Sequence, residues 1–492
     1  MKALLLYPEF PDTFWSFKHA LKFIGKKASL PPLGLLTVAA MLPLDWEKRL
    51  VDVNLRPLRD KDLAWADVVL ISAMIAQRDS AVQLIARCRA AGKTIVAGGP
   101  LFTGEHAQFP EVDHLVLNEA EVTLPEFLRD FACGGARHLY MSTDLPDLQE
   151  TPAPLWELAD LRRYASMSVQ YSRGCPFDCD FCSVTAMFGH RPRVKTSSQI
   201  ISELDGLWRR GWRGAVFFVD DNLIGNKRSL RDDLLPALIS WRQGKRGFAF
   251  YTEASINLAD DENLMRQMVA AAFDQVFVGI ETPEEASLTE CNKRQNRSRD
   301  LVADVKRIQR AGLQVQGGFI VGFDNDPPTI FQRQIDFIQK SGIVTAMVGL
   351  LQAVPGTKLH ERLHQQGRLL GESTGDNVDG TTNFIPRMQR ETLRDGYRRL
   401  MDYLYAPGPY YRRIRTFLRE YRPARMSEGM TLGNVGAFAR ASVRLGVIGR
   451  ERFHFWALLV WTGFRRPTLV PLAVRLSIYG FHFRKCCAAL GA

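Results

Sequence analysis

The residues whose type and spacing most clearly indicate chemistry are three cysteines within eight positions, Cys175, Cys179 and Cys182. They form the pattern C-x3-C-x2-C directly after the segment YSRG. Three thiolates this close together can hold three irons of a [4Fe–4S] cluster, which usually takes four cysteines. Because no fourth cysteine lies nearby in the sequence, one iron would stay open to an outside ligand. The alternative is a structural zinc loop, for which His190 is a possible fourth ligand.

The remaining composition describes a globular protein with free thiols. Of the 492 residues, 46% are hydrophobic and 24% are charged, which excludes collagen-like and fully disordered classes. Eight cysteines are too few for a disulfide scaffold in a chain of this length. The initial apolar run, MKALLLYPEF, is too short for the core of a signal peptide. We therefore expect a cytoplasmic protein whose thiols are available to metal.

The cysteines lie in a region, residues 168–385, where strands and helices alternate regularly. Six short apolar strands, each followed by a helical pattern, predict an incomplete (β/α)6 barrel with its chemistry at the C-terminal ends of the strands. The predicted strands are Ser168–Ser172, Gly214–Val219, Ala249–Thr252, Gln275–Ile280, Gln316–Val321 and Met347–Leu351. Polar residues stand at several of these ends: Asp221, Glu253, Glu281 and Gln352.

Residues 1–145 alternate in the same way and predict a separate α/β domain with a doubly wound parallel sheet. Its predicted strands are Ala3–Tyr7, Arg49–Val53, Val68–Ser72, Thr94–Ala97 and His114–Leu117. Ligands of such sheets bind beyond the carboxyl ends of the strands. A proline-containing linker, residues 146–167, is expected to join this domain to the barrel.

The order of these features resembles the radical SAM superfamily, whose cluster motif is C-x3-C-x2-C with an aromatic residue before the third cysteine. The segment Gly318–Gly322 is similar to its adenine motif. The resemblance implies that the open iron binds the amine and carboxylate of S-adenosylmethionine (SAM). An electron from a donor such as flavodoxin or ferredoxin would then cleave SAM to a 5′-deoxyadenosyl radical, which abstracts hydrogen from an unreactive carbon. The SAM-binding residues it implies are Phe181, Asp221, Glu253, Glu281, Gly318, Ile320, Val321 and Gln352.

The first domain resembles the cobalamin-binding domain that precedes the barrel in many radical SAM methyltransferases. The motif that ligates cobalt through histidine, D-x-H-x-x-G, is not matched, because Asn54 stands where the histidine would be. We expect cobalamin with no histidine ligand below cobalt, in a cleft that faces the barrel mouth and that glycines open to close approach. The alternative is a domain that has lost the cofactor. The candidate cobalamin-binding residues are Asn54, Ser72, Met74, Gly98, Gly99, Pro100 and Glu119.

Within the superfamily, residues 1–360 are similar to a subgroup that includes the hopanoid C-2 methylases. Shared phrases include YPEFPDTFWSFKHA, QYSRGCPFDCDFC, TEASINLADD and MVGLLQAVPGTKL. The segment after the cysteines, Ser183–Gly189, differs from what is typical of those methylases. Because this segment borders the predicted active site, the substrate is free to differ as well.

These features together predict a cobalamin-dependent methyltransferase that acts on an unactivated carbon of a small or lipid-like substrate. One alternative is transfer of another SAM fragment, the aminocarboxypropyl group, to a heteroatom without cobalamin. A second is a non-catalytic iron–sulfur protein with a binding or regulatory role. The presence of a corrinoid, and release of 5′-deoxyadenosine or methylthioadenosine, separates these alternatives.

The C-terminal region, residues 386–492, is predicted to be a helical domain and carries the positive charge of the chain. Residues 387–492 hold 19 Arg and one Lys against six acids, whereas the whole chain has a net charge of +11. One interpretation is a cap packed on the barrel with solvated charges. The other is a peripheral membrane surface, with arginines beside the apolar segment Phe453–Phe464. Nucleic acid is not expected, because no nucleic-acid motif accompanies the charge. The arginines expected to cluster are Arg412, Arg413, Arg415, Arg419, Arg422 and Arg425.

Overall fold

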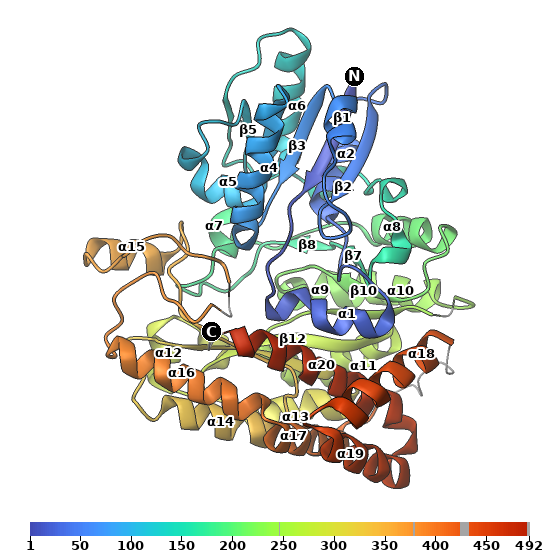
Figure 1. The fold of residues 1–492 in the computed structure, drawn as a ribbon, viewed down its shortest axis with the longest axis vertical. Helices are drawn as coiled ribbons and strands as arrows, with labels where there is room; N and C mark the ends of the chain where they lie inside the picture. The colour runs from blue at the N-terminus through green and yellow to red at the C-terminus, as the bar shows by residue number, and fades with distance from the viewer. Residues whose placement is uncertain (246, 377–378, 424–431, 490–492) are drawn as a thin grey trace.

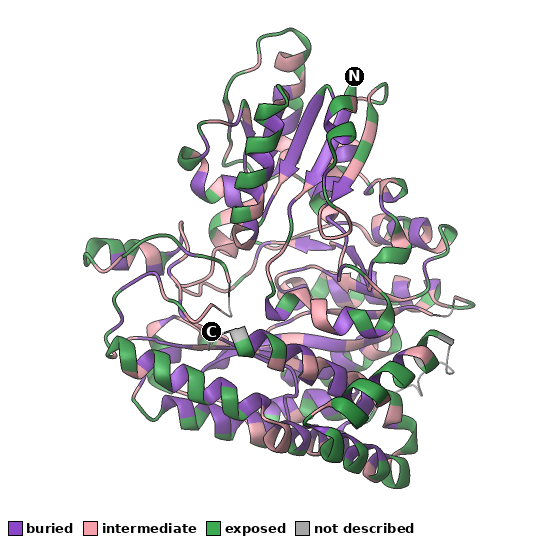
Figure 2. Cartoon of the chain, in the orientation of Figure 1, coloured by how far each residue is buried: buried purple, intermediate pink, exposed green. Residues whose placement is uncertain are grey.

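The structure is a computed structural model that describes all residues except 246, 377–378, 424–431 and 490–492. It has an upper α/β layer, a second α/β layer below it, and a set of C-terminal helices at the base (Figure 1). This is the predicted fold class. The strands of both sheets are largely buried, and exposed residues lie mainly on the outer helices (Figure 2).

The upper layer is a six-stranded parallel sheet in the order β2-β1-β3-β4-β5-β6. This is the flavodoxin-like doubly wound order with one more edge strand, and it reverses between β1 and β3. The strands are β1 (Lys2–Tyr7), β2 (Glu47–Asp52), β3 (Val68–Ser72), β4 (Thr94–Gly98), β5 (His114–Val116) and β6 (Leu139–Tyr140). The helices are α2 (Leu33–Met41), α3 (Asp60–Trp65), α4 (Arg78–Ala90), α5 (Pro100–Glu105) and α6 (Ala120–Ala132), with short turns η2 (Ile75–Gln77) and η3 (His106–Gln108).

Alternation along the strands explains why helices cover both faces of this sheet. Leu4, Val69 and Ile95 point into one apolar cluster, whereas Ala3, Leu70 and Val96 point into another. A strand directs successive side chains to opposite faces, so continuous apolar runs need cover on both sides. The predicted strands of this domain are confirmed to within two residues at each end. The short strand β6 was not predicted, because two residues give no periodic signal.

Between β1 and α2 the chain leaves the upper layer and packs on the C-terminal helices. This excursion contains the turn η1 (Phe14–Ser16) and helix α1 (Lys18–Ile24), which lies beside the last helix, α20 (Figure 1). Phe17 joins η1 to α1 with a φ of 48°, a left-handed conformation that is unusual for a bulky residue. The predicted linker contains the short turns η4 (Leu148–Glu150), η5 (Trp156–Leu158) and η6 (Leu161–Arg163).

The second layer is a six-stranded parallel sheet in the order β14-β13-β12-β11-β10-β7. Consecutive strands are neighbours throughout, as in an open part of a barrel. The strands are β7 (Met167–Val169), β10 (Ala215–Phe218), β11 (Ala249–Glu253), β12 (Phe273–Glu281), β13 (Gln314–Val321) and β14 (Ala346–Leu350); a separate antiparallel pair is β8 (Ser172–Arg173) and β9 (Arg193–Val194). All six predicted strands are present, although the first ends at Val169 and Ser172 belongs to β8.

Helices follow these strands and cover the outer face of the sheet. The longer ones are α8 (Ser197–Arg209), α10 (Leu235–Trp241), α11 (Glu262–Ala270), α13 (Leu301–Ala311), α14 (Ile330–Ser341) and α15 (Lys358–Gln365). The shorter ones are α7 (Val184–Phe188), η7 (Leu223–Asn226), α9 (Lys227–Ser229), the π-helical η8 (Leu230–Leu234), η9 (Ile256–Asp260), α12 (Glu285–Glu290) and η10 (Arg294–Asn296).

The C-terminal helices pack against α13, α14 and one edge of this sheet. They are α16 (Arg390–Tyr405), α17 (Pro407–Glu420), α18 (Leu432–Ala441), the π-helical η11 (Ser442–Ile448), α19 (Arg452–Arg465), η12 (Pro467–Leu469) and α20 (Val470–Ala489). Tyr397 donates a hydrogen bond to the Val348 carbonyl of β14 at 2.9 Å, which fixes α16 on the edge strand. In the part of the chain that the structure describes, no helix is both long and apolar enough to cross a membrane.

The expected arginine cluster does not form one surface. Arg413 is fully buried and donates to the carbonyls of Leu404 and Val344. Arg412, Arg419 and Arg422 are exposed, Arg415 is half-buried, and Arg425 lies outside the described residues. The prediction of a single six-residue cluster was therefore wrong, because helical periodicity turns Arg413 toward the barrel edge.

Candidate functional site

The cysteine loop is held in place by backbone hydrogen bonds to two separate segments. The Cys175 N–H donates to the Gly189 carbonyl at 3.2 Å, and the Asp180 N–H donates to the Cys291 carbonyl at 3.0 Å. Gly174 enters the loop with a φ of 95°, and a Cβ there would lie 2.9 Å from the Gly189 carbonyl oxygen. A glycine is therefore required immediately before the first cysteine.

Amide donors approach the cysteine sulfurs from two sides. The Asn222 side-chain amide lies 3.9 Å from Cys175 Sγ, and the Gln295 side-chain amide lies 3.7 Å from Cys179 Sγ. Hydrogen bonds to cluster sulfurs are one way in which proteins tune an iron–sulfur centre. Burial raises the pKa of all three thiols, to about 12 for Cys182, so metal binding must displace their protons.

The spacing of the three sulfurs favours a cluster over a single zinc ion. Within the described ranges, only His19, His482 and Cys486 bring three metal-ligand atoms within 4.8 Å of one another. The sulfurs of Cys175, Cys179 and Cys182 are therefore spread more widely than that. Around one zinc ion, sulfurs at about 2.3 Å from the metal would be roughly 4 Å apart. The donor set fits a [4Fe–4S] cluster whose irons are ligated at separate corners.

The three strand-end carboxylates gather at the barrel mouth, as predicted, rather than on its outside. Asp221 follows β10, Glu253 ends β11 and Glu281 ends β12. Burial first, and then the neighbouring acids Asp221 and Glu281, raise the pKa of Glu253 to about 8. Burial also raises the pKa of Asp221 to about 6. Among the described residues, none forms an ion pair or a side-chain hydrogen bond with the Glu253 carboxylate, although the charge of Lys293 acts on it.

Glu281 is paired with a lysine that sequence reasoning did not identify. Lys293 Nζ lies 2.6 Å from the Glu281 carboxylate, with both side chains nearly buried. Burial lowers the pKa of Lys293, but Glu281 and Cys179 outweigh this effect and hold the pKa above its ordinary value. Gly279 makes room for the pair, because a Cβ at that position would lie 2.3 Å from Glu281 Oε1. In the sequence, Lys293 is simply the lysine that follows Cys291-Asn292, and no motif marks it as a residue of the site.

Asp220 is a second residue that the sequence did not reveal as important. It is completely buried, and its carboxylate accepts hydrogen bonds from the backbone N–H groups of Tyr171 and Ser172. Burial raises the pKa of Asp220 to about 7. The carboxylate thus ties the end of β10 to the strand that leads into the cysteine loop. The sequence shows the adjacent acids Asp220 and Asp221. It does not show that Asp220 holds the backbone while Asp221 lies at the barrel mouth.

The predicted adenine-side residues divide between the mouth and the core. Phe181 and Ile320 belong to one apolar cluster, and the Phe181 ring lies 6.2 Å from that of Phe323. Gly318 and Ile320 share the half-exposed face of β13, whereas Val321 is fully buried on the other face. The structure brings Phe181 and Ile320 together but directs the Val321 side chain away from them.

Gln352 is engaged by the loop that follows α15. Its side-chain oxygen accepts a hydrogen bond from Ser373 at 2.5 Å, and its amide donates to Thr374 at 3.1 Å. The same loop touches the upper domain, because a Cβ on Gly375 would lie 2.9 Å from the Ala76 backbone. Gln352 therefore stands at the mouth as a support for a loop between the two layers.

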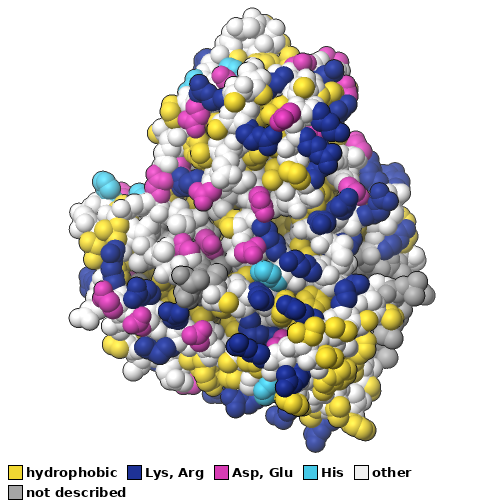
Figure 3. Space-filling model, in the orientation of Figure 1, with side chains coloured by type: hydrophobic (Ala, Val, Ile, Leu, Met, Phe, Trp, Pro, Cys, Tyr) yellow, Lys and Arg dark blue, Asp and Glu magenta, His cyan; other side chains and the backbone are white. Residues whose placement is uncertain are grey.

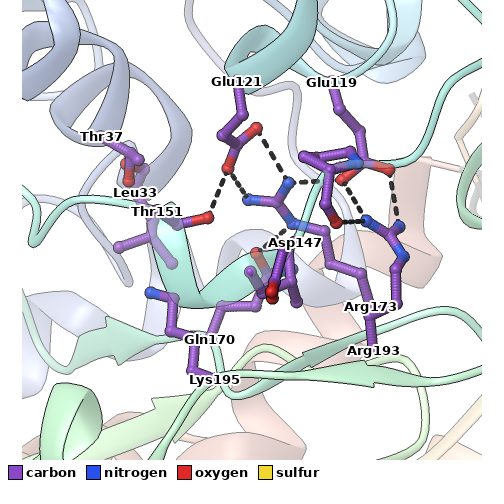
Figure 4. A network of polar contacts seen from close by, with 12 residues as sticks. Leu33, Thr37, Glu119, Glu121, Asp147, Thr151, Gln170, Arg173, Arg193 and Lys195 are labelled. Atoms are coloured by element: carbon purple, nitrogen blue, oxygen red, sulfur yellow. Dashed lines mark hydrogen bonds and ion pairs between the residues drawn. The ribbon is translucent and has the colours of Figure 1, made fainter.

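A buried ion-pair network joins the upper domain to the cysteine loop (Figure 4). Arg173 lies 2.6 Å from Glu119 and 2.8 Å from Glu121, at the start of α6. Arg193 lies 2.6 Å from Glu119, and Thr151 donates to Glu121 at 2.8 Å. Because Arg173 precedes Cys175 by two residues, the network fixes the cluster loop relative to the upper sheet. Glu119, a predicted cobalamin residue, is occupied by these arginines.

The predicted cobalamin glycines serve the packing of the sheet itself. A Cβ on Gly98 would lie 2.5 Å from the Val116 carbonyl oxygen, and a Cβ on Gly99 would lie 2.5 Å from Ser72 Oγ. Gly99 also has a φ of 92° as it begins α5 with Pro100. These glycines are needed for close backbone contact between neighbouring strand ends.

The side chain of Asn54 is also engaged in hydrogen bonds within the protein. Its side chain accepts from the Phe10 N–H at 2.9 Å and donates to the Pro8 carbonyl at 3.0 Å. It therefore links the loops after the neighbouring strands β1 and β2 instead of replacing a cobalt ligand.

Three observations nevertheless fit a corrinoid at the carboxyl edge of the upper sheet. The strand order reverses between β1 and β3, where doubly wound sheets bind cofactors, and this edge faces the second layer (Figure 1). At the same edge, the buried Asn118 Oδ1 has no hydrogen-bond partner among the described residues. Met74, beyond β3, is 47% exposed. These groups could contact a bulky ligand between the layers.

Comparisons with known proteins match each part of this architecture. The family model described as the B12 binding domain matches residues 27–128, that of the radical SAM superfamily residues 169–338, and a domain of unknown function, DUF4070, residues 357–491. In fold, the chain resembles the cobalamin-dependent SAM radical enzyme OxsB (TM-score 0.64, 14% identity, 100% of this chain and 84% of that chain). It also resembles the radical SAM methyltransferase TsrM from Kitasatospora setae (TM-score 0.58, 14% identity, 80% and 84%).

Two relatives are similar over almost the whole chain. An uncharacterized methyltransferase of Synechocystis sp. is 42% identical over 98% of this chain and 91% of its own length. The hopanoid C-2 methylase of Rhodopseudomonas palustris is 32% identical over 92% of this chain and 88% of its own. The chain therefore belongs to the radical SAM superfamily and, within it, to the cobalamin-binding methyltransferases. Its cofactors are a [4Fe–4S] cluster, SAM and cobalamin.

Proposed function

We propose that this enzyme methylates an unactivated carbon of a lipid-like substrate at the cytoplasmic face of a membrane. The observation that carries methyl transfer is the buried network of Glu119 and Glu121 with Arg173 and Arg193. It holds the ligand-binding edge of the upper sheet against the loop that bears the cluster cysteines. A methyl donor at that edge and a substrate radical at the barrel mouth would then share one space.

The bound cofactors supply the hard chemistry: the cluster gives the electron that cleaves SAM, and cobalamin carries the methyl group. The protein supplies ligands, orientation and charge. Cys175, Cys179 and Cys182 hold the cluster, and Lys293 places a positive charge near their thiolates. An external electron donor such as flavodoxin or ferredoxin would deliver the electron.

The chain's own acids receive the cationic SAM. Glu253 holds a proton on its carboxyl group at neutral pH in the SAM-free site, because its pKa is about 8. Positive charge on the sulfonium and ammonium groups favours the ionised carboxylate, so binding should release this proton. Phe181 and Ile320 offer the apolar surface on which the adenine would lie.

An exposed apolar surface near the C-terminus supports the lipid-like substrate and the membrane contact. Hydrophobic side chains gather at the lower right of the molecule, over α18 and α19, with basic side chains around them (Figure 3). Phe453 is 74% exposed and Phe464 is 88% exposed. Arg452 and Arg465 stand next to them in the sequence and are exposed. In residues 429–492, Glu451 is the only acid, and it is buried against Arg484.

Such a surface suits an anionic bilayer, at which each Lys or Arg contributes about 1 kcal/mol. The test is sedimentation of the full-length protein with phosphatidylserine-containing vesicles at low and high salt. The variant Phe453→Ser/Phe464→Ser should lose most of the binding. Leu44→Ser, which changes a fully exposed leucine in the upper domain, is the matched control and should bind normally. Equal sedimentation of both variants would contradict the membrane contact.

Methyl transfer itself is tested with SAM that carries a deuterated methyl group. The anaerobically reconstituted enzyme, supplied with cobalamin, reductant and a membrane lipid extract, should form 5′-deoxyadenosine, S-adenosylhomocysteine and a lipid that carries the label. Formation of methylthioadenosine without lipid labelling would instead support aminocarboxypropyl transfer.

A further inference from the structure

A second cluster of metal-ligating side chains lies far along the sequence from the Cys175–Cys182 loop. His19 of α1 meets His482 and Cys486 of α20, and one ligand atom of each lies within 4.8 Å of the others. His482 and Cys486 are buried, and the His19 side chain is 23% exposed. The cluster therefore joins the N-terminal excursion to the last helix, and one of its three members reaches solvent.

The surrounding hydrogen bonds orient both imidazoles as they are oriented in metal sites. His482 Nε2 lies 3.1 Å from the Phe14 carbonyl, which can only accept, so this nitrogen carries the proton and Nδ1 keeps its lone pair. Cys486 Sγ lies 3.7 Å from this Nδ1 and also 3.7 Å from Nε2. His19 Nε2 lies 3.2 Å from the Asp12 carboxylate. Metal-ligating histidines usually donate their second ring N–H to a backbone carbonyl or a carboxylate in this way.

We propose that His19, His482 and Cys486 bind a zinc ion. Two imidazoles and one thiolate match the preference of Zn²⁺ for nitrogen and sulfur, and the 3.7 Å separation of Nδ1 and Sγ is close to that of two ligands on one tetrahedral zinc. Three protein ligands leave a fourth position, which solvent can reach on the His19 side. This site is distinct from the three-cysteine loop and does not rest on the proposed reaction.

The local chemistry agrees with a metal and gives it a structural role. The charges of the Cys486 thiolate and Asp12 would together neutralise Zn²⁺. A thiol hydrogen-bonded to the Thr13 carbonyl, 3.6 Å away, would account for Cys486 alone. It would not account for a second imidazole, that of His19, with a ligand atom within 4.8 Å of the same sulfur. The zinc would pin residues 12–19 to α20 and so hold α1 on the C-terminal helices.

The experiment measures zinc per chain in the full-length protein with its iron–sulfur cluster reconstituted, after growth with zinc and removal of loosely bound metal. The wild type should retain one equivalent of zinc, and Cys486→Ala and His19→Gln should retain almost none. Cys487→Ala alters the neighbouring buried cysteine, whose sulfur is not in the cluster, and should retain the wild-type amount. The triple variant Cys175→Ala/Cys179→Ala/Cys182→Ala should also keep its zinc.

Cobalt provides a second readout that reports directly whether a thiolate ligates the metal. Co²⁺ in place of zinc should give a thiolate-to-cobalt charge-transfer band in the Cys175→Ala/Cys179→Ala/Cys182→Ala background. That band should disappear when Cys486→Ala is added. His19→Gln changes a residue that is partly exposed, so its loss of zinc cannot be attributed to a collapsed core. Zinc that is equal in the wild type and Cys486→Ala, or that is lost only with the three loop cysteines, would overturn the proposal.

Discussion

Replacing Glu119 by Gln should have two effects: it should weaken the connection between the two layers, and it should reduce the rate of SAM cleavage. The Glu119 side chain is 3% exposed and contacts Arg173 and Arg193, whose side chains are 12% and 16% exposed. Breaking a buried ion pair by removing one partner costs about 3–5 kcal/mol, because the other charge is left uncompensated. Glu121 still pairs with Arg173, and Arg193 still donates to the Pro146 carbonyl. We therefore expect a loss near the lower limit, about 3 kcal/mol.

The loss can be read from anaerobic urea unfolding followed by tryptophan fluorescence. With an m-value of about 1–3 kcal/mol per molar urea, a loss of about 3 kcal/mol lowers the midpoint by roughly 1–3 M. The rate of 5′-deoxyadenosine formation should fall as well, because Arg173 precedes Cys175 by two residues. A displacement of about 1 Å at a catalytic group can cost up to about 10²-fold in rate.

Glu126→Gln provides a control on the same helix. Glu126 pairs with Arg137 at the surface, where both side chains are about half exposed, so its replacement should change neither the midpoint nor the rate. If Glu119→Gln and Glu126→Gln have the same midpoint, the network does not hold the layers together. A lower midpoint with an unchanged rate would show that the network stabilises the fold without positioning the cluster.

Three further predictions concern the site and its cofactors. Cys179→Ala should lose the cluster iron and all SAM cleavage, measured by iron content and 5′-deoxyadenosine; retained activity would refute the assignment of this ligand. SAM should bind the wild type more tightly as the pH rises toward 8, by at most tenfold per unit, since Glu253 must give up a proton. Calorimetry in buffers of different ionisation enthalpy should show proton release that Glu253→Gln abolishes, and a pH-independent affinity in both proteins would contradict this role. Gly99→Ala should destabilise the upper domain by about 1–3 kcal/mol, because its Cβ would meet Ser72 Oγ at 2.5 Å in a left-handed conformation; an unchanged urea midpoint would show that the strand ends adjust freely.

The sequence was sufficient to predict the strands and the cysteine loop, because both depend on local patterns. Val68–Ser72 is an uninterrupted buried run, and the three cysteines lie within eight residues. The position of Asp221 and Glu253 followed in turn, since residues at the carboxyl ends of neighbouring parallel strands converge.

The rest of the site depends on contacts between distant segments, which no local pattern encodes. Glu119 and Arg173 are 54 positions apart, and nothing near either residue indicates that they form a buried pair. The glycines at 98 and 99 were correctly recognised as special, but the sequence does not distinguish a close approach to a ligand from a close approach to Val116. In the sequence, Arg413 does not differ from the surface arginines around it. The packing of α17 in the structure shows that it is buried.

The most direct test of the account combines corrinoid content with the fate of SAM in one preparation. The enzyme is purified anaerobically from cells supplied with cobalamin, its cluster is reconstituted, and it is incubated with SAM and a one-electron reductant. We predict a stoichiometric corrinoid in the purified protein and reductant-dependent 5′-deoxyadenosine, both present in the wild type, with 5′-deoxyadenosine absent from Cys179→Ala. A protein that binds no corrinoid and converts SAM to methylthioadenosine would contradict the account.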